Sequence, residues 1–195
     1  MYAAASMRDL SFGIQMSVTD VGVGNHSGFD IKWAFCYNRH MAKCYILIGI
    51  PGSGKSTWIK SQPFDWSNTV VASTDDYVDR EARNQGKTYS EIFKDTMPDA
   101  VAYMAETVVD AVKAGKDIVW DQTSTTVPSR ARKFRMLPAN YEVIAVVFRT
   151  PDAAELTRRL KSRPGKEIPD HVIESMRANW QEPTKAEGFA EIIYP

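Results

Sequence analysis

The sequence has no surplus of charge of either sign, because 24 lysines and arginines balance 24 aspartates and glutamates. No net field therefore draws the chain to nucleic acid or to a membrane surface, and a polyanion would have to be held by a local patch. Cysteine is scarce as well. Cys36 and Cys44 are too few for a disulfide framework and lack the spacing of metal ligands, so we expect free thiols in a reducing cytoplasm.

Long apolar runs are also missing from the sequence. No stretch approaches the roughly 18 residues that a membrane-spanning helix needs, so we expect no membrane partner. The opening residues, MYAAASMRDL, lack a basic segment followed by an apolar one, which argues against a secretory signal. With 195 residues, the chain is long enough for one domain with a substantial core.

The composition changes near Met41. Residues 1–40 contain 6 of the 48 charged residues and 4 of the 11 glycines, and they sustain neither helical nor strand periodicity. The run MAKCYILIGIPGSGKST follows, with an apolar strand at its start. We expect a folded domain over residues 41–195. Residues 1–40 are then either an irregular N-terminal extension or an artefact of an upstream start codon. A regulatory or partner-binding arm is the alternative.

Apolar runs of strand length alternate with segments of helical periodicity from residue 41 onward. The predicted strands are 44–48, 69–73, 117–121, 142–148 and 190–194. The predicted helices are 55–61, 77–95 with a break at Gly86, 98–114 opened by Pro98, 128–137, 152–163 and 169–180. This alternation is typical of the α/β class, in which helices cover both faces of a parallel sheet.

A glycine-rich loop follows the first predicted strand. It fits the pattern G-x-x-x-x-G-K-[ST], and its residues are Gly49, Ile50, Pro51, Gly52, Ser53, Gly54, Lys55, Ser56 and the adjoining Thr57. Glycines allow consecutive backbone amides to point at a phosphate, and the following helix directs its positive end at the same anion. Lys55 would reach the β- and γ-phosphates, and Ser56 would bind Mg²⁺. The loop therefore predicts a nucleoside triphosphate site.

Aspartates follow the second and third predicted strands. Asp75 and Asp76 lie where a strand end faces the nucleotide crevice, and a carboxylate there can take a proton from an attacking hydroxyl. We predict Asp75 as the general base and Asp76 as a helix cap or a supporting group, although either can cap the helix. Asp121 would hold Ser56 or a Mg²⁺-bound water, with a turn aspartate as the alternative.

Two basic clusters lie on later helices. The first comprises Arg130, Arg132, Lys133 and Arg135, and the second comprises Arg158, Arg159, Lys161, Arg163 and Lys166. The second cluster leads into Pro164-Gly165, a hinge-like break. An arginine on a mobile lid stabilises the charge of a phosphoryl group in transfer, and Arg163, beside the break, is the best candidate. Most of the other cations are expected on solvated helix faces.

Four segments resemble the kinase domain of phage polynucleotide 5′-hydroxyl kinases and the wider zeta-toxin-like, AAA-type P-loop kinases. They are IGIPGSGKSTW, STDDY, WDQTS and ELTRRLKSRPGKEIPDHVIESM, and the resemblance spans about residues 43–182. It implies a doubly wound, five-stranded parallel sheet of order 2-3-1-4-5 with a helical lid. It also implies ATP and Mg²⁺ at Lys55 and Ser56, Asp75 as the base, Asp121 after the third strand, and lid arginines at Arg163 and Arg159.

Two positions depart from the pattern of those kinases. Val78 stands where D-D-Y-R has a phosphate-gripping arginine, with Arg80 as the nearest basic residue, and Ser124 replaces a common asparagine. The predicted activity is ATP-dependent phosphorylation of a polynucleotide 5′-OH end, and the candidates for acceptor binding are Asp76, Arg80, Thr123 and Arg130. A small-molecule hydroxyl acceptor (a sugar, nucleotide-sugar or antibiotic) and a non-kinase ATP-binding switch remain as alternatives.

Overall fold

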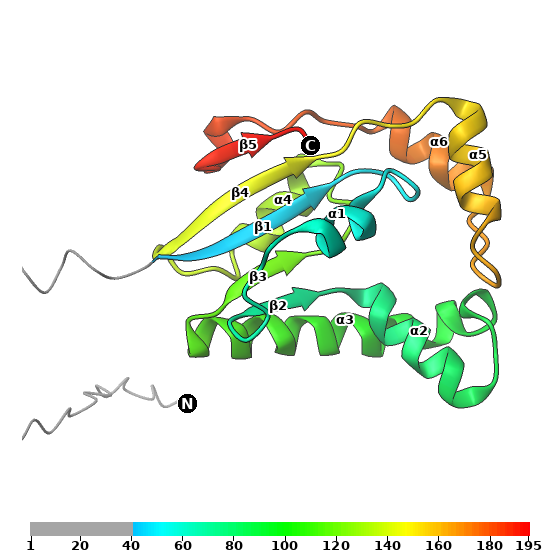
Figure 1. The fold of residues 1–195 in the computed structure, drawn as a ribbon, viewed down its shortest axis with the longest axis horizontal. Helices are drawn as coiled ribbons and strands as arrows, with labels where there is room; N and C mark the ends of the chain where they lie inside the picture. Colours follow the sequence, from blue (N-terminus) through cyan, green and yellow to red (C-terminus); the bar gives the residue numbers. More distant parts are fainter. Residues whose placement is uncertain (1–40) are drawn as a thin grey trace, which may run out of the picture. The chain divides into compact units, whose positions relative to one another are not determined.

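The computed structural model describes residues 41–195, and the predictions for residues 1–40 lie outside this range. Within residues 41–195, no helix combines the length and the apolar character needed to cross a membrane. The described chain alternates strands with helices, as the sequence predicts (Figure 1).

A parallel five-stranded sheet forms the centre of the fold. Its strands are β1 (Ala42–Ile48), β2 (Thr69–Ala72), β3 (Asp117–Trp120), β4 (Tyr141–Val147) and β5 (Glu191–Ile193). They lie in the order β2-β3-β1-β4-β5, which confirms the predicted doubly wound topology. In the register of the central strands, Cys44 of β1 lies opposite Ile118 of β3 and Val143 of β4. All three side chains are buried, as expected where helices cover both faces of a sheet.

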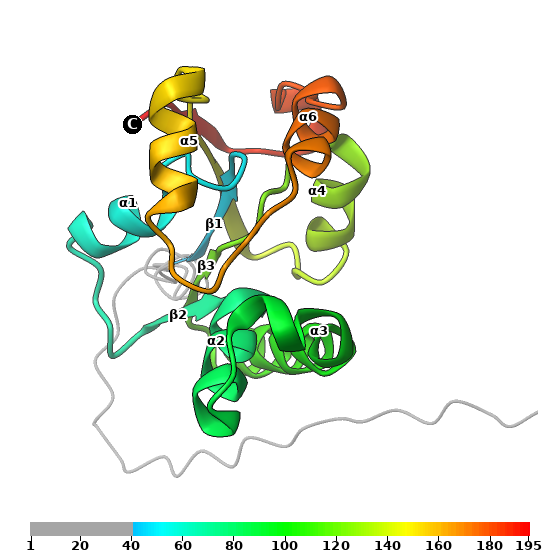
Figure 2. The ribbon, with the colours of Figure 1, turned by 90° about the vertical axis from the view of Figure 1, so that its right-hand side faces the viewer.

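Within residues 41–195, six α-helices and one short 3₁₀ helix connect the strands. They are α1 (Lys55–Ser61), α2 (Thr74–Gln85), α3 (Tyr89–Ala114), α4 (Val127–Phe134), α5 (Ala153–Lys161), α6 (Asp170–Ala178) and η1 (Lys185–Glu187). Residues of α3 and α4 pack with one set of strand side chains, whereas α1 packs with the other set. Figure 2 shows α1 and α4 on opposite sides of β1.

Helix α3 begins earlier than the sequence pattern predicts. Pro98 was expected to open a helix, but α3 starts at Tyr89 and continues through Pro98. A capping box fixes this earlier start: the Thr88 side chain accepts from the Glu91 amide, and the Glu91 carboxylate accepts from the Thr88 amide. Pro98 is exposed, so the helix tolerates the loss of the one backbone hydrogen bond that proline cannot form.

Helices α5 and α6 form a small unit above the glycine-rich loop. Leu156 of α5 and Ile173 of α6 pack on Ile50 of that loop in a separate apolar cluster. Residues 162–169, which we call the strap, connect the two helices. The strap descends from α5 toward α2 and α3 and returns to α6 (Figures 1 and 2). The predicted lid therefore lies over the carboxyl edge of the sheet.

Candidate active site

The glycine-rich loop holds the start of α1 open for an anion. Gly52 and Gly54 adopt φ values of +84° and +106°, which favour glycine, and a Cβ on Gly52 would lie 2.8 Å from Leu156 Cδ1. No side chain caps α1, and its first turn has no acidic residue. The Ser53 hydroxyl is buried without a hydrogen-bond partner in the described chain. Free amides at a helix start, beside an unpartnered hydroxyl, fit a bound phosphate.

Lys55 lies at the centre of this loop. Its ammonium donates hydrogen bonds to the carbonyl oxygens of Gly49 (2.8 Å) and Ile50 (3.0 Å). Burial lowers the pKa of Lys55 to about 8, although the carboxylates of Asp121 and Asp75 act in the opposite direction. The charges of these two aspartates therefore reach the lysine that is predicted to hold the β- and γ-phosphates.

Neighbouring segments fix the backbone of the loop. The Gly49 amide donates to the carbonyl of Thr123, at 2.9 Å, in the segment after β3. The Arg159 guanidinium of α5 donates to the Gly52 carbonyl at 3.1 Å and is oriented by Glu155 at 2.6 Å. Two residues predicted to act on substrates, Thr123 and Arg159, thus contact the loop itself.

The two aspartates at the start of α2 differ in environment. Ser73 is the helix cap, since its hydroxyl accepts from the Asp76 amide, so neither aspartate is needed for capping. The Asp75 carboxylate accepts from the Tyr89 hydroxyl at 2.8 Å and from the Lys166 ammonium at 2.5 Å. Each oxygen of the Asp75 carboxylate therefore accepts one hydrogen bond, on the side of α2 that faces the strap.

The ionisation of the two aspartates differs as well. Burial alone would raise the pKa of Asp75, but the charge and hydrogen bond of Lys166, with the Tyr89 hydrogen bond, hold that pKa below its usual value. The pKa of Asp76 is raised, first by burial and then by the nearby carboxylates of Asp75 and Asp79. The neighbours of Asp75 therefore favour its ionised form, whereas the surroundings of Asp76 disfavour ionisation.

Asp121 follows β3 directly and faces the same edge of the sheet. Its amide donates to the Ala72 carbonyl at 3.0 Å, and burial raises the pKa of its carboxyl, which Lys55 partly offsets. Ser56 is exposed at the start of α1. Among residues 41–195, no three His, Cys, Asp or Glu side chains gather as metal ligands. A hydroxyl and a carboxylate are oxygen donors of the kind that Mg²⁺ prefers, and Mg²⁺ takes few protein ligands when phosphates complete its shell.

A cleft of about 560 Å³ runs between the loop and α5. One wall consists of the loop and the start of α1, and the other consists of α5 and the beginning of the strap. Arg163 lines this cleft, and its charge is near enough to lower the pKa of Lys55. The structure therefore brings Lys55, Asp75, Asp121 and Arg163 to one edge of the sheet.

Arg130 is a correction to the predicted site. It was expected to bind the acceptor, but its side chain is completely buried and forms a bidentate ion pair with Glu187, at 2.7 and 2.9 Å. It also donates to the carbonyls of Ser124 (3.1 Å) and Gln181 (3.0 Å). With all of these donors engaged inside the protein, Arg130 has a structural role.

Arg80 and Val78 are also placed differently from a phosphate-gripping arginine. The Arg80 guanidinium lies over the rings of Tyr77 and Tyr103, 4.8 Å from each centroid, and bonds to Glu81. Val78 is fully buried in a small core between α2 and α3. Position 78 therefore points into the protein and not toward an acceptor, and acceptor binding by Arg80 stays a prediction.

Two residues of the site escaped the sequence analysis. Lys166 appeared only as one member of a basic cluster, and Tyr89 lay inside a segment expected to be a polar helix. Each reaches Asp75 only through the tertiary fold, since Lys166 is 91 residues away in sequence. The Pro164-Gly165 break beside a run of cations was the one available signal for the strap.

Comparison with known proteins agrees with this architecture. The sequence profile of the AAA domain matches residues 45–183, which is most of the chain. The chain belongs to the AAA domain family. This AAA domain is 26% identical over 152 residues to the bifunctional polynucleotide phosphatase/kinase of Schizosaccharomyces pombe, covering 75% of this chain and 32% of that protein. It is 24% identical over 160 residues to the mouse heterogeneous nuclear ribonucleoprotein U-like protein 2, covering 76% and 21%.

The AAA domain spans between about a fifth and a third of these relatives. Among solved structures, it is similar to a chain of the Pnkp1/Rnl/Hen1 RNA repair complex, with a TM-score of 0.56, 24% identity, and coverage of 73% of this chain and 45% of that one. A kinase-like structure from Chloroflexus aurantiacus has a TM-score of 0.59 and 15% identity, and the match covers 80% of this chain and 88% of that one. A chain of the PezAT toxin–antitoxin system of Streptococcus pneumoniae has a TM-score of 0.54 and 17% identity, and the match covers 84% of this chain and 72% of that one. These likenesses confirm the P-loop fold and the expected resemblance.

Proposed function

We propose that this AAA domain is an ATP-dependent kinase that transfers a phosphoryl group to a hydroxyl acceptor. The observation that carries the proposal is the position of Asp75. Its carboxylate lies at the same sheet edge as Lys55, close enough to influence the pKa of that lysine, and its own pKa is held low. A phosphate-binding loop with an ionised, hydrogen-bonded carboxylate at the same sheet edge suits phosphoryl transfer to a hydroxyl, because the carboxylate can accept the hydroxyl proton.

Each residue has a defined task in this reaction. The amides at the start of α1 and the Lys55 ammonium would bind the phosphates of ATP, and Ser56 and Asp121 would hold Mg²⁺. When bound, Mg²⁺ neutralises charge on the phosphate oxygens. Asp75 accepts the proton of the acceptor hydroxyl. The hydroxyl oxygen then bonds to the γ-phosphorus, while the bond from that phosphorus to ADP breaks and ADP departs. Arg163, which lines the cleft, would stabilise the charge on the phosphoryl group during transfer.

We infer that the acceptor is the 5′-OH end of a polynucleotide. The polynucleotide phosphatase/kinase relative and the sequence resemblance support this acceptor. The runner-up is a small-molecule hydroxyl, which is favoured by the burial of Val78 at the position where those kinases have a phosphate-gripping arginine. The two readings share the chemistry of Asp75 and differ only in what is presented to it.

An acceptor panel tests the proposal. The full chain is incubated with γ-labelled ATP, Mg²⁺ and one acceptor at a time: a 5′-OH oligonucleotide, the same oligonucleotide already carrying a 5′-phosphate, a sugar or a nucleotide-sugar. We expect label transfer to the first and none to the second. Transfer to sugars or nucleotide-sugars instead would move the acceptor to small molecules. Slow ATP hydrolysis at a rate that no acceptor changes, with no label transferred, would contradict kinase function and favour an ATP-binding switch.

A further inference from the structure

The strap carries a cation to the proposed general base. The Lys166 ammonium lies 2.5 Å from Asp75 Oδ2 and 3.8 Å from the centroid of the Tyr89 ring, and only 13% of its side chain is exposed. The Tyr89 hydroxyl bonds to the other oxygen of Asp75. Lys166 therefore fills a site built from a carboxylate on one helix and an aromatic face on the next.

The backbone on both sides of Lys166 is fastened to α3. The Ser90 amide donates to the Gly165 carbonyl at 3.0 Å, and the Glu167 amide donates to the Ser90 hydroxyl at 2.8 Å. Gly165 has φ +71°, and a Cβ there would lie 2.9 Å from Thr88 Cβ. The close approach needs glycine, and these contacts fix the backbone of the strap on both sides of Lys166.

The charges that face Asp75 make this contact important. Lys166 comes from the strap, Tyr89 from α3 and Lys55 from α1, while the carboxylates of Asp76 and Asp121 lie nearby. Lys55 is assigned to the phosphates of ATP. Without Lys166, Asp75 would therefore face two other carboxylates with no cation of its own.

Lys166 leaves room for the acceptor. A carboxylate offers about four lone-pair positions, and the described contacts at Asp75 come from one ammonium and one hydroxyl. Arg163, three residues earlier, lines the ATP cleft. One strap thus places one cation beside the nucleotide and another on the base.

We propose that Lys166 is a positioning residue that couples docking of the strap on α3 to the orientation of the Asp75 carboxylate for proton transfer. The role rests on the proposed kinase function but predicts a physical coupling that can be measured without turnover. In the docked state, Lys166 and Tyr89 fix both oxygens of Asp75. In the undocked state, the carboxylate loses its cation and its fixed orientation.

Hydrogen exchange at the Ser90 amide tests the coupling in the full chain. Lys166→Met should speed exchange of this amide by at least about fivefold, as expected for loss of a partly buried ion pair. Lys161→Met makes the same chemical change at an exposed position of α5 and should leave the amide unchanged. Asp75→Asn should speed exchange as well, and the double variant should add little to either single one.

Kinetics test the consequence for catalysis. Lys166→Met should lower kcat by about 10- to 100-fold through misplacement of the base, with the KM for ATP nearly unchanged. The acidic limb of kcat/KM should move to higher pH, because the pKa of Asp75 rises when Lys166 no longer lowers it. Lys166→Arg, which keeps the charge, should recover part of kcat.

The outcomes separate the inference from the proposed function. Unchanged Ser90 exchange in Lys166→Met, or additive effects in the double variant, would overturn the coupling. A lower KM for the acceptor without loss of kcat would also overturn it, since Lys166 would then obstruct the base. A wild-type protein that phosphorylates no acceptor would refute the kinase proposal, while the exchange cycle would still decide whether Lys166 and Asp75 hold the strap.

Discussion

Replacing Arg130 with methionine should destabilise the protein strongly without weakening acceptor binding. The guanidinium is completely buried, and its partner Glu187 has only 11% of its side chain exposed. The substitution would remove the ion-pair partner of Glu187, which keeps only the Thr184 amide as a donor, and would remove a donor from the carbonyls of Ser124 and Gln181. Breaking a buried pair by removing one partner costs about 3–5 kcal/mol.

This cost is a large share of the total stability of an ordinary domain, which is about 5–15 kcal/mol. Urea unfolding of the full chain, followed by tryptophan fluorescence, measures it directly. Arg132→Met on the same helix is the matched control, because Arg132 is exposed and its loss should change the free energy of unfolding by less than about 0.5 kcal/mol.

A double-variant cycle sharpens the test. Glu187→Met should also be costly, because it leaves the guanidinium buried and unpaired, and the Arg130→Met/Glu187→Met variant should cost clearly less than the sum of the two. If Arg130→Met unfolds like the wild type and raises the KM for the acceptor, the reasoning is refuted and Arg130 returns to the substrate site.

Three further predictions follow from buried or strained positions. Burial lowers the pKa of Lys133 to about 8, so at pH 7 the wild type bears the cost of burying a charged lysine, and Lys133→Met should be more stable by about 3 kcal/mol. This difference should disappear as pH rises toward 10.5, because the wild type then folds with a neutral lysine. Measuring the free energy of unfolding at both pH values checks this. Gly52→Ala should weaken ATP binding in calorimetry through its clash with Leu156, whereas Gly86→Ala, with no atom within 4 Å, should not. ATP affinity should fall above pH 8 as free Lys55 loses its proton, and a Lys55→Arg variant whose affinity falls equally would contradict this.

Local patterns predicted the framework of the protein well. The loop from Gly49 to Ser56 has a fixed spacing, and the buried strands are short apolar runs, so both were visible in the sequence. Strand bounds differ from the predicted ones by at most two residues at either end. Helix α3 was divided wrongly at Pro98, because the capping box at Thr88 and Glu91 outweighs one exposed proline.

Side-chain partners could not be predicted in the same way. Arg130 and Glu187 are 57 residues apart, and Lys166 and Asp75 are 91 apart, so each pair forms only when the chain folds. Within one basic cluster, Arg163 reaches the cleft while Lys166 reaches the base. A helical pattern shows that cations share a segment, but it does not show which partner each one meets.

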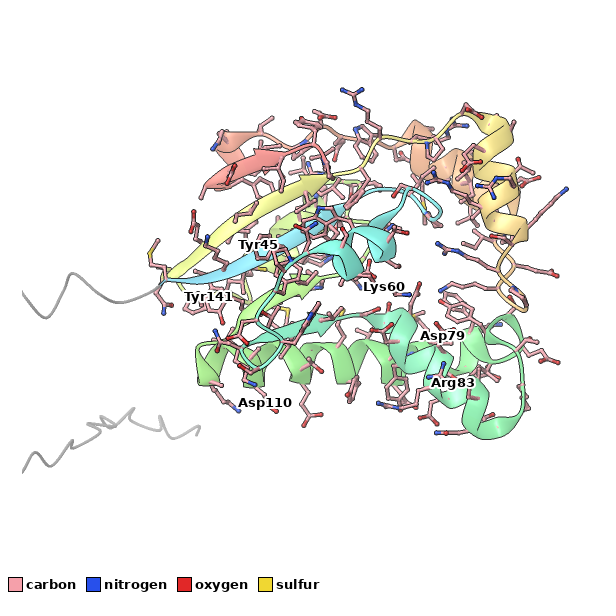
Figure 3. The ribbon with its side chains drawn as sticks, in the orientation of Figure 1. Tyr45, Lys60, Asp79, Arg83, Asp110 and Tyr141 are labelled. Carbon is pink, nitrogen blue, oxygen red and sulfur yellow. The ribbon has the colours of Figure 1, made fainter. Side chains whose placement is uncertain are left out.

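The identity of the base is the central claim, and single-turnover transfer from γ-labelled ATP to a 5′-OH oligonucleotide tests it most directly. Asp75→Asn is compared with Asp110→Asn, an exposed aspartate at the other end of α3 from the strap (Figure 3). We predict that Asp75→Asn lowers the rate by about 10²- to 10⁴-fold while ATP still binds, and that Asp110→Asn behaves like the wild type. Equal rates for Asp75→Asn and the wild type would contradict the account.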